Sequence, residues 1–389
     1  MHVEAEESLS GRLRWAVNVS LWEPSGGSGG TEFKLLLAFI EPQEEREQVE
    51  KFVFDADKKR ALVSRLLVRR ASALILGLDN FNDIAIARTK GKKPFLHSPR
   101  PLATALANFN FNVSHEGDWV VLASEPLCVC GVDVAAPKQG RTVECDIFRD
   151  FEEQLSAKEW AEVRQEGSLP ARYEGADMLY EAFQRRWSCK EAYVKARGDG
   201  LGFEPLRRAS FTFESSPTED GRTQATVTVD GKLESQWRFF QQRLGTDHWV
   251  TVARGPTEGV VDAQGIFQAS LRCPTSSFTA DVWQEELRAF DPSFSELHVV
   301  DLIPRAAVSD YAACLGITTD SALACCRLAP VCRSPVAMEL HQCYHCAASA
   351  RFRCSRCKKA AFCSQGCQRM CWSRHRTDCV ALEKKKKKK

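Results

Sequence analysis

The pattern of apolar and polar residues divides most of the chain into strands and helices. RLRWAVNVSLW (residues 12–22) has strand character, and RASFTF, QATVTVDG, WRFF and HWVTVAR, which follow residue 207, predict antiparallel strands joined by hairpin turns. Apolar residues recur at helical spacing from Asp55 to Leu76, and Gly77 stands where a helix commonly ends. This mixture predicts the α+β fold class.

The helix expected from Asp55 to Leu76 is rich in basic side chains. Most of them should be solvated charges of a helix surface, while one or two could line a phosphate site. These basic residues are Lys58, Lys59, Arg60, Arg65, Arg69 and Arg70.

A second long helical pattern begins near Ala176 and leads into WSCKEAYVKARGDGLGF (187–203), after a shorter helix that the capping box SAKE (156–159) predicts. Glu191 and Lys195 are four residues apart, so they share one face of this helix. A carboxylate that can ligate a hard cation or accept a proton, next to an ammonium that can neutralise phosphate oxygens, suits phosphate chemistry. Taken alone, such a pair is more often a solvated surface pair.

Three upstream segments favour the phosphate hypothesis. WVVLASEPLCVC and GVDVAAP predict two strands around a Glu-Pro turn, which places Asp133 at or near a strand end. NFNFNVSHEGDW supplies Ser114 and His115 in a polar break between apolar runs, and RTKGKKPFL gathers basic residues around Gly91. These segments add a carboxylate, a hydroxyl, an imidazole and several cations to the Glu–Lys helix.

Length and composition favour a cytoplasmic protein of two or three domains, because 389 residues are too many for one core. The chain has no apolar run of membrane-spanning length, and its acidic start, MHVEAEESLSGR, lacks the apolar stretch of a signal peptide, so we expect no membrane contact. Of the 17 cysteines, eight follow residue 340 in metal-like spacing, and the others are scattered, as in reduced proteins.

The formal net charge of +2 hides an asymmetry. Residues 351–389 contain 14 Lys+Arg and 2 Asp+Glu, so the rest of the chain has a net charge of −10. Nucleic acid is therefore not an expected partner. The basic tail, residues 383–389, is expected to be a solvated charge run, with a nuclear import signal or a contact with acidic partners as the alternatives.

The motifs G-K-x-P, N-x-S-H, G-V-D and W-x-x-K-E-x-x-x-K-A, followed by G-x-G-L-G-F, occur in this order within residues 12–254. In this order the chain resembles the Sfp-type 4′-phosphopantetheinyl transferases, in particular the longer eukaryotic kind typified by the aminoadipate-semialdehyde-dehydrogenase phosphopantetheinyl transferase. The resemblance implies two similar α/β halves (12–130 and 131–254) with antiparallel sheets and packed helices, and coenzyme A bound between them. Residues 255–340 are expected to be a linker or to hold an extra small element.

The same resemblance implies transfer of 4′-phosphopantetheine from coenzyme A to a serine of an apo acyl or peptidyl carrier protein, with release of adenosine 3′,5′-bisphosphate. Asp133 and Glu191 would hold Mg²⁺ against the pyrophosphate, and Glu191 would also take the serine proton directly or through a water. Lys195 would stabilise charge on the phosphate under attack. The other coenzyme A contacts would come from Arg88, Lys90, Gly91, Lys92, Lys93, Asn112, Val113, Ser114 and His115.

Two positions depart from the family pattern. Ala135 stands where bacterial relatives often have a second acid. The longer eukaryotic kind also lacks an acid at this place, which supports the resemblance to that kind. We therefore expect Glu116 to contribute to the Mg²⁺ shell directly or through water, against the equally weighted alternative of a surface acid in a turn. Gln48 occupies the place of a nucleotide-binding arginine, and Arg46 is the nearest substitute.

Other residues near the Glu–Lys pair have mainly structural expectations. Trp187 should support the helix, and Lys190 points in another direction on it, so a packing or salt-bridge role is as probable as assistance in catalysis. The glycine run at 198, 200 and 202 is expected to end the helix and turn the chain towards a strand, in preference to cradling a phosphate.

The segment 341–380 contains enough ligands for two tetrahedral Zn²⁺ ions, whose binding would supply its folding energy. Its spacing resembles the MYND zinc finger, a module that binds peptides, often proline-rich ones, so we expect a proline-rich protein partner. Cys371 is a surplus thiol, but it falls one helical turn after Cys367 and is the first alternative ligand. The resemblance implies one ion on Cys343, Cys346, Cys363 and Cys367 and the other on Cys354, Cys357, His375 and Cys379.

The competing hypothesis is a MYND adaptor protein whose transferase-like part is a catalytically inactive scaffold. The presence of Asp133, Glu191 and Lys195 together with Ser114 and His115 favours the enzyme. The sequence does not identify the carrier protein, which could belong to a fatty-acid synthase, a polyketide synthase, an aminoadipate reductase or a mitochondrial system.

Overall fold

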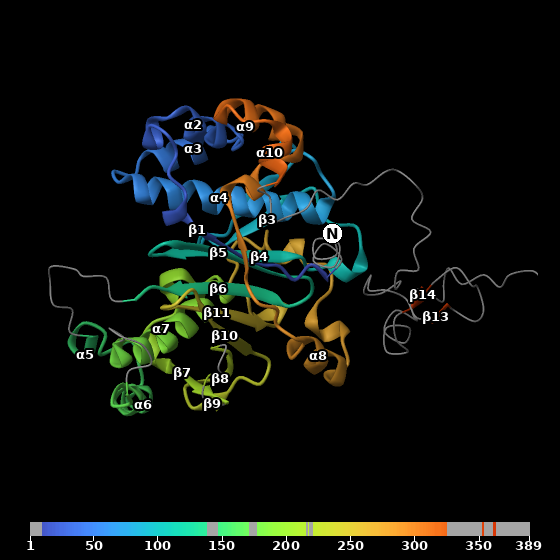
Figure 1. Ribbon diagram of the computed structural model, residues 1–389. Helices are drawn as coiled ribbons and strands as arrows, with labels where there is room; N and C mark the ends of the chain where they lie inside the picture. Colours follow the sequence, from blue (N-terminus) through green and yellow to red (C-terminus); the bar gives the residue numbers. More distant parts are fainter. Residues whose placement is uncertain are drawn as a thin grey trace, which may run out of the picture.

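The computed structural model describes residues 10–137, 147–170, 177–214, 217 and 221–324, together with the backbone of two short paired strands, β13 (Phe352–Arg353) and β14 (Ala361–Phe362). Two larger sheets lie one above the other at the centre, with helices on their outer faces (Figure 1). The predicted α+β class is confirmed. Among the described helices, none combines the length and the apolar character needed to cross a bilayer.

The upper sheet in Figure 1 has the strand order β12-β1-β5-β4. Strands β1, β5 and β4 are antiparallel, whereas β12, which comes from the segment after residue 255, pairs in parallel with β1. Helix α4 packs on this sheet. Above α4 in Figure 1 lie four more helices, α2, α3, α9 and α10. The elements are β1 (Arg14–Asn18), α2 (Thr31–Ala38), α3 (Gln43–Glu50), α4 (Asp55–Leu76), β4 (Asn110–Glu116), β5 (Trp119–Glu125), β12 (Ser295–Leu297), α9 (Val308–Leu315) and α10 (Thr319–Ala324).

The lower sheet has the order β6-β11-β10-β8-β7, with β9 paired to β8, and all of its pairs are antiparallel, as predicted. Helix α7 packs on β6 and β11, and α6 packs on α7. A separate hairpin, β2–β3, precedes β4 in the chain. The elements are β2 (Ala85–Arg88), β3 (Pro94–Ser98), β6 (Val129–Ala135), α5 (Ile147–Asp150), α6 (Ala157–Gly167), α7 (Met178–Arg197), β7 (Ala209–Phe213), β8 (Thr223–Val229), β9 (Lys232–Leu233), β10 (Arg238–Leu244) and β11 (His248–Gly255).

Helix α4 has the bounds that the sequence predicted, and Gly77, with a φ of 69°, ends it. The expectation that its basic side chains are mostly solvated is wrong for three of them, because neighbouring segments cover that side of the helix. Lys59 forms an ion pair with Glu23, Arg69 forms one with Glu45, and Arg70 donates to the carbonyl of Asp301.

Local signals for the lower half are also confirmed. The predicted capping box opens α6: Ser156 Oγ accepts a hydrogen bond from Glu159 N (3.3 Å), and the Glu159 carboxylate accepts one from Ser156 N (2.8 Å). On α7, Trp187 packs against Phe151 and Phe183, which is the supporting role expected of it.

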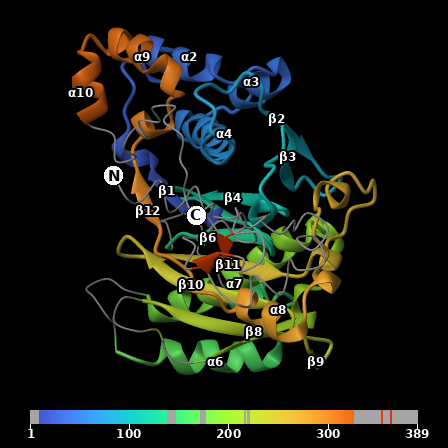
Figure 2. The same cartoon turned by 90° about the vertical axis from the view of Figure 1, so that its right-hand side faces the viewer.

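The segment after residue 255, which the sequence left open as a linker or a small element, returns to the upper half. It forms α8 (Ala280–Leu287) and then β12, α9 and α10. Figure 2 shows β12 beside β1 and α9 close to α2. Tyr311 on α9 donates to Glu32 on α2, with 2.7 Å between the oxygen atoms.

A buried ionic network ties this segment to both sheets. Arg254 on β11 bonds to Glu125 on β5 (2.7 Å) and to Asp291 (2.6 Å), and Arg14 on β1 bonds to the same two carboxylates. Although burial alone would raise the pKa of Glu125, the guanidiniums of Arg12, Arg254 and Arg14 hold it well below its usual range. The two halves and the added segment therefore share one set of buried charges.

Side-chain amides join the two sheets where β4 lies next to β6. The Oδ1 atom of Asn110 accepts from Cys130 N (2.9 Å), and that of Asn112 accepts from Val132 N (3.0 Å). The alternation in NFNFN explains this arrangement, because successive strand residues point to opposite faces. The asparagines face β6, while Phe109 and Phe111 enter the upper core.

We predict that Asn110→Leu lowers the free energy of unfolding by about 3 kcal/mol or more, because it leaves several buried backbone groups without a partner. Asn110 accepts from Cys130 N and donates to the carbonyls of Asn108 and Cys128 (2.8 Å each), and its own exposure is 0%. Chemical denaturation measures the change. Asn82→Leu, at an exposed position, is the control. Equal stabilities of the two variants would contradict the role given to the amide.

Candidate active site between the two halves

Asp133, Ser114 and Lys195 meet at the junction of the sheets. Asp133 on β6 is 5% exposed, and its Oδ1 atom accepts from Lys195 Nζ (2.5 Å) and Ser114 Oγ (3.1 Å). Lys195 Nζ also donates to Ser114 Oγ (2.8 Å). Ser114 follows Asn110 and Asn112 on the same face of β4, so the row of side chains that joins the sheets ends on this carboxylate.

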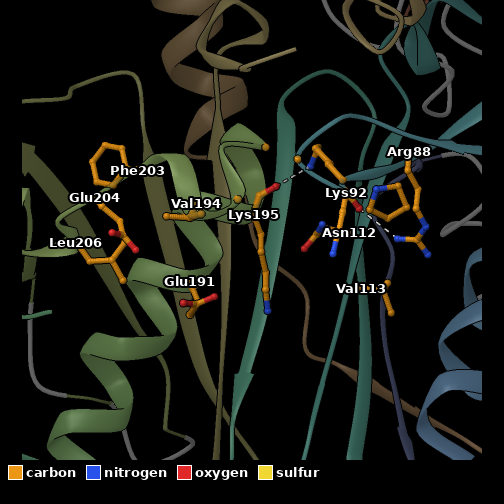
Figure 3. A pocket seen from close by; sticks show the side chains of 15 residues that line it. Arg88, Lys92, Asn112, Val113, Glu191, Val194, Lys195, Phe203, Glu204 and Leu206 are labelled. Carbon is orange, nitrogen blue, oxygen red and sulfur yellow. Dashed lines mark hydrogen bonds between the residues drawn. The ribbon is translucent and has the colours of Figure 1, made fainter. Parts of the chain in front are cut away.

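Glu191 lies one turn before Lys195 on α7 and lines the same centre (Figure 3). Burial and then the charge of Asp133 raise the pKa of Glu191, against the opposing effect of Lys195. Burial also raises the pKa of Asp133, which its bonds to Lys195 and Ser114 oppose. The Lys195 ammonium thus pairs with Asp133 rather than with Glu191. Two carboxylates that repel one another in a partly dry site form a place where a cation would be stabilised.

A cavity of about 340 Å³ opens beside these residues. Figure 3 shows Glu191 and Lys195 on α7 at one side and Arg88, Lys92 and Asn112 at the other. The cavity therefore takes one wall from each half of the molecule. Its lining consists of Arg88, Gly91, Lys92, Lys93, Pro94, Asn112, Val113, Glu191, Val194, Lys195, Gly198, Gly200, Phe203, Glu204 and Leu206.

The tip of the β2–β3 hairpin rests on the end of α7. A Cβ atom on Gly91 would lie 2.0 Å from the carbonyl oxygen of Gly198, so only glycine fits there. Lys92, with a φ of 67°, and Arg88 line the cavity, whereas Lys90 is not among the lining residues. Lys93 also lines it, but its ammonium donates to two backbone carbonyls, one of which is drawn in Figure 3.

Residues 112–116 are part of strand β4, so the expectation of a polar loop is wrong. The cause is that their polar side chains face β6 and the cavity, which allows a polar sequence inside a paired strand. His115 and Glu116 at the end of the strand are exposed, and Glu116 Oε2 accepts from Ala136 N (3.1 Å). In the described residues, no group of three or more His, Cys, Asp or Glu side chains is placed to hold a metal ion.

The pKa of His115 lies below its usual range, which favours the neutral imidazole. Desolvation by the surrounding protein, and then the charges of Lys195 and Arg60, lower its pKa to about 4. Its ring therefore offers one donor and one acceptor nitrogen instead of a positive charge.

Arg46, the suggested substitute for the missing arginine, is engaged elsewhere. Its Nη1 atom donates to the carbonyls of Ile40 (2.8 Å) and Glu41 (2.7 Å). Gln48 instead accepts a hydrogen bond from Arg65 Nη2 on α4 (3.0 Å). Of the basic residues of α4, Arg65 is therefore the one that we expect to contribute to a phosphate site.

Arg65 belongs to a group of guanidiniums next to the cavity. Burial lowers its pKa, Glu45 acts in the opposite direction, and the charges of Arg88 and Arg69 lower it further. Glu45 forms ion pairs with Arg65 Nε (3.5 Å) and Arg69 Nη1 (3.2 Å), and the buried Arg69 Nη2 atom has no hydrogen-bond partner among the described residues. Such an excess of buried donors and positive charge suits an anion.

Two secondary expectations are settled by geometry. Lys190 is fully buried and forms a salt bridge with Glu159 (2.9 Å). Of the roles considered for Lys190, this is the salt-bridge role and not assistance in catalysis. Gly198, with a φ of 79°, ends α7, and a short 3₁₀ turn from Gly200 to Gly202 follows, so the helix-end interpretation of the glycines is confirmed. The eight proposed zinc ligands, from Cys343 to His375 and Cys379, lie outside the described residues.

Several residues of the site were absent from the sequence-based set. Phe203, Glu204 and Leu206 line the cavity, and Asn110 holds β4 against β6. For Asn110, the alternation of Asn and Phe in NFNFN was the available sequence signal, because alternate residues of a strand lie on the same face. The direction of the Lys93 side chain had no signal of its own in the sequence.

Comparison with known proteins agrees with this geometry. Residues 20–127 match the family model for the N-terminal part of 4′-phosphopantetheinyl transferase, and residues 129–253 match that of the 4′-phosphopantetheinyl transferase superfamily. Residues 343–379 match the MYND finger, a zinc-binding domain that mediates protein interactions. The two transferase matches meet between β5 and β6, so one match contains the residues of one cavity wall and the other match those of the opposite wall.

Named relatives cover the same region. The chain is 32% identical over 270 residues to the L-aminoadipate-semialdehyde dehydrogenase-phosphopantetheinyl transferase of Mus musculus, which spans 69% of this chain and 82% of that protein. It is 38% identical to a phosphopantetheinyl transferase of Thraustochytrium sp. (61% of this chain, 77% of that protein). A 4′-phosphopantetheinyl transferase of Bacillus subtilis is 31% identical over 45% of this chain and 66% of its own length. This chain belongs to the 4′-phosphopantetheinyl transferase superfamily, whose members are transferases that act on carrier proteins with coenzyme A.

Proposed function

We propose that this enzyme moves the 4′-phosphopantetheine group of coenzyme A to a serine hydroxyl of an apo acyl or peptidyl carrier protein, in a reaction that depends on Mg²⁺. The observation that carries the proposal is the placement of Glu191 and Lys195 at the edge of a cavity with a basic opposite wall, with Asp133 bonded to Lys195. Such a site can bind a polyanionic substrate through its cations and can accept a proton through a carboxylate.

The donor set fits Mg²⁺. Asp133 and Glu191 supply hard carboxylate oxygens, and the increase of each pKa by burial indicates charge that a cation would stabilise. Two protein carboxylates are a sufficient set, because Mg²⁺ keeps waters and takes substrate phosphate oxygens as its other ligands. When bound, it would neutralise charge on the pyrophosphate.

The roles of the protein groups follow from their positions. Glu191 takes the proton of the serine hydroxyl, directly or through a water, as the serine oxygen bonds to the phosphorus that carries pantetheine. The bond from that phosphorus to the bridging oxygen breaks, and adenosine 3′,5′-bisphosphate leaves with the electron pair. Lys195, whose side chain is 30% exposed, stabilises the charge on the phosphate oxygens.

The nucleotide end of coenzyme A is proposed to lie against the basic wall. Arg88, Lys92, Asn112 and Val113 line it, while Gly91 allows the hairpin to reach α7. Ser114, His115, Lys90 and Arg65 do not line the cavity and are proposed as further contacts of the nucleotide end. The resemblance also implied that Lys93 contacts coenzyme A.

We predict that Asp133→Ala or Glu191→Ala abolishes carrier modification, because each removes half of the proposed carboxylate pair. Lys195→Ala should lower turnover about 10²-fold, the usual effect of losing one charge stabiliser. Purified protein is incubated with coenzyme A, Mg²⁺ and a panel of apo-carrier proteins, and intact mass is recorded. Glu285→Ala, on the exposed side of α8, is the control and should retain full activity. Normal modification by either carboxylate variant would refute the assignment.

Glu116 is proposed to act on the Mg²⁺ shell through water. It continues the β4 face that carries Asn112 and Ser114, and its carboxylate reaches Ala136 at the end of β6. Coordination through water agrees with the lack of a third metal-type side chain next to the carboxylate pair in the described chain.

Glu116→Gln should raise the Mg²⁺ concentration needed for the half-maximal rate, since it removes the charge but keeps the shape. Asp118→Asn, an exposed acid in the same hairpin turn, is the matched control and should leave the Mg²⁺ titration unchanged. Titration curves that coincide for the two variants would remove Glu116 from the site.

We also propose that the MYND finger recruits a proline-rich protein or a large synthase and takes no part in the chemistry. All residues that line the cavity lie between positions 88 and 206, well before the finger. Charge stabilisation at the phosphate is already supplied by the groups of the cavity.

Deletion of residues 338–389 should therefore leave transfer to a free carrier protein nearly intact. The full chain should hold about two zinc ions, as expected from eight ligands at four per site. Cys354→Ser should lose zinc, whereas Cys371→Ser, which changes the surplus thiol, should keep both ions. Atomic emission gives the metal content. A folded but inactive deletion variant would show that the finger belongs to the active enzyme.

A further inference from the structure

Two adjacent lysines at the tip of the β2–β3 hairpin have different surroundings. Lys92 is exposed, lines the cavity, and makes no side-chain hydrogen bond to another described residue. Lys93 is 3% exposed, and its Nζ atom donates to the carbonyl oxygens of Cys130 (2.5 Å) and Lys195 (3.2 Å). The Lys93 ammonium also lies 5.6 Å from the centre of the Phe267 ring. One lysine is open to an anion, and the other is used inside the protein.

The two carbonyls belong to the elements that carry the proposed Mg²⁺ ligands. Cys130 lies on β6, three residues before Asp133. Lys195 lies in the last turn of α7, one turn after Glu191, where helix carbonyls lack donors within the helix. An ammonium at this position satisfies the carbonyl and complements the helix dipole. Lys93 thus connects the strand of one carboxylate to the helix of the other.

The backbone around Lys93 is also fixed. Gly91 lies so close to Gly198 that a Cβ atom on it would be 2.0 Å from the Gly198 oxygen, and Thr89 N donates to the Lys93 carbonyl (3.0 Å). The backbone of the hairpin is therefore held against α7, and the Lys93 ammonium could reach a ligand in the cavity only by giving up its two carbonyl partners. Burial lowers the pKa of Lys93 to about 8, in agreement with an ammonium that has carbonyl partners and no carboxylate among the groups acting on it.

We propose that Lys93 is a positioning residue, which fixes the separation between β6 and α7 and hence between Asp133 and Glu191, and that Lys92 provides the phosphate contact. The proposal rests on the proposed function, because it takes the carboxylate pair as the Mg²⁺ site. It predicts that loss of the Lys93 ammonium weakens the Mg²⁺-dependent part of coenzyme A binding and spares the remainder.

The test compares Lys92→Met and Lys93→Met in the full chain by titration calorimetry of coenzyme A, in EDTA and in Mg²⁺. Lys93→Met should change the affinity in EDTA by less than about twofold and reduce the Mg²⁺ enhancement about tenfold, a typical effect of losing a group that supports metal ligands. Lys92→Met should weaken binding by about fivefold under both conditions, as expected for one exposed charge pair. Combining Lys93→Met with Glu191→Gln should give a non-additive loss, because both act on the same metal site.

Equal losses in EDTA for both variants would overturn the proposal, since they would make Lys93 a direct ligand of coenzyme A. An unchanged Mg²⁺ enhancement in Lys93→Met would overturn it as well. Thermal unfolding checks that the variant is folded. If it is not, Lys93→Arg, which keeps the charge but changes the reach of the donors, is judged by the same two affinities. A wild-type chain without Mg²⁺-enhanced binding would instead refute the proposed function.

Discussion

The molecule depends on how two stacked sheets that share no strand pairing in the described chain are held together. An apolar layer fills the space between them, and side-chain amides join them where β4 lies next to β6. Asn110 and Asn112 supply side-chain acceptors to the backbone N–H groups of β6, in place of the carbonyls of a neighbouring strand. The next residue on that face, Ser114, bonds to Asp133. The joint and the site are thus one row of side chains, and a shift of β4 along β6 would displace the carboxylate that the chemistry needs. Buried amides allow no such shift, because each would lose its partner in a dry environment.

The buried ionic network is a second constraint. Arg14, Glu125, Arg254 and Asp291 come from β1, β5, β11 and the segment after α8, and all are buried. A buried ion network adds little net stability compared with apolar packing, but breaking it is costly. A different arrangement of the two halves would therefore break these ion pairs at a large cost in free energy. The segment after residue 255, which the sequence left open as a linker or a small element, contributes to both halves, because β12 pairs with β1 and Asp291 bonds to Arg254 on β11.

The features that the sequence predicted well are those set by nearby residues. Helix α4, the capping box at Ser156 and the helix end at Gly198 each depend on contacts within a few positions. The errors concern partners far along the chain. Arg70 is buried because the carbonyl of Asp301 lies over it, and polar residues 112–116 form a strand because β6 receives their side chains. The motifs identified Asp133, Glu191 and Lys195, but only the folded chain places the Lys195 ammonium on Asp133 rather than on Glu191.

The charge of the cavity follows from these placements. Its lining includes the cations Arg88, Lys92, Lys93 and Lys195 and the carboxylates Glu191 and Glu204. With Lys93 committed to backbone carbonyls and Lys195 to Asp133, the positive charge that faces an incoming anion comes mainly from Arg88 and Lys92, with Arg65 behind them. The carboxylate pair lies across the cavity from these cations. The field of the cavity therefore draws the phosphates of an incoming ligand towards Arg88 and Lys92, whereas the carboxylate pair would need a bound cation before a phosphate could approach it.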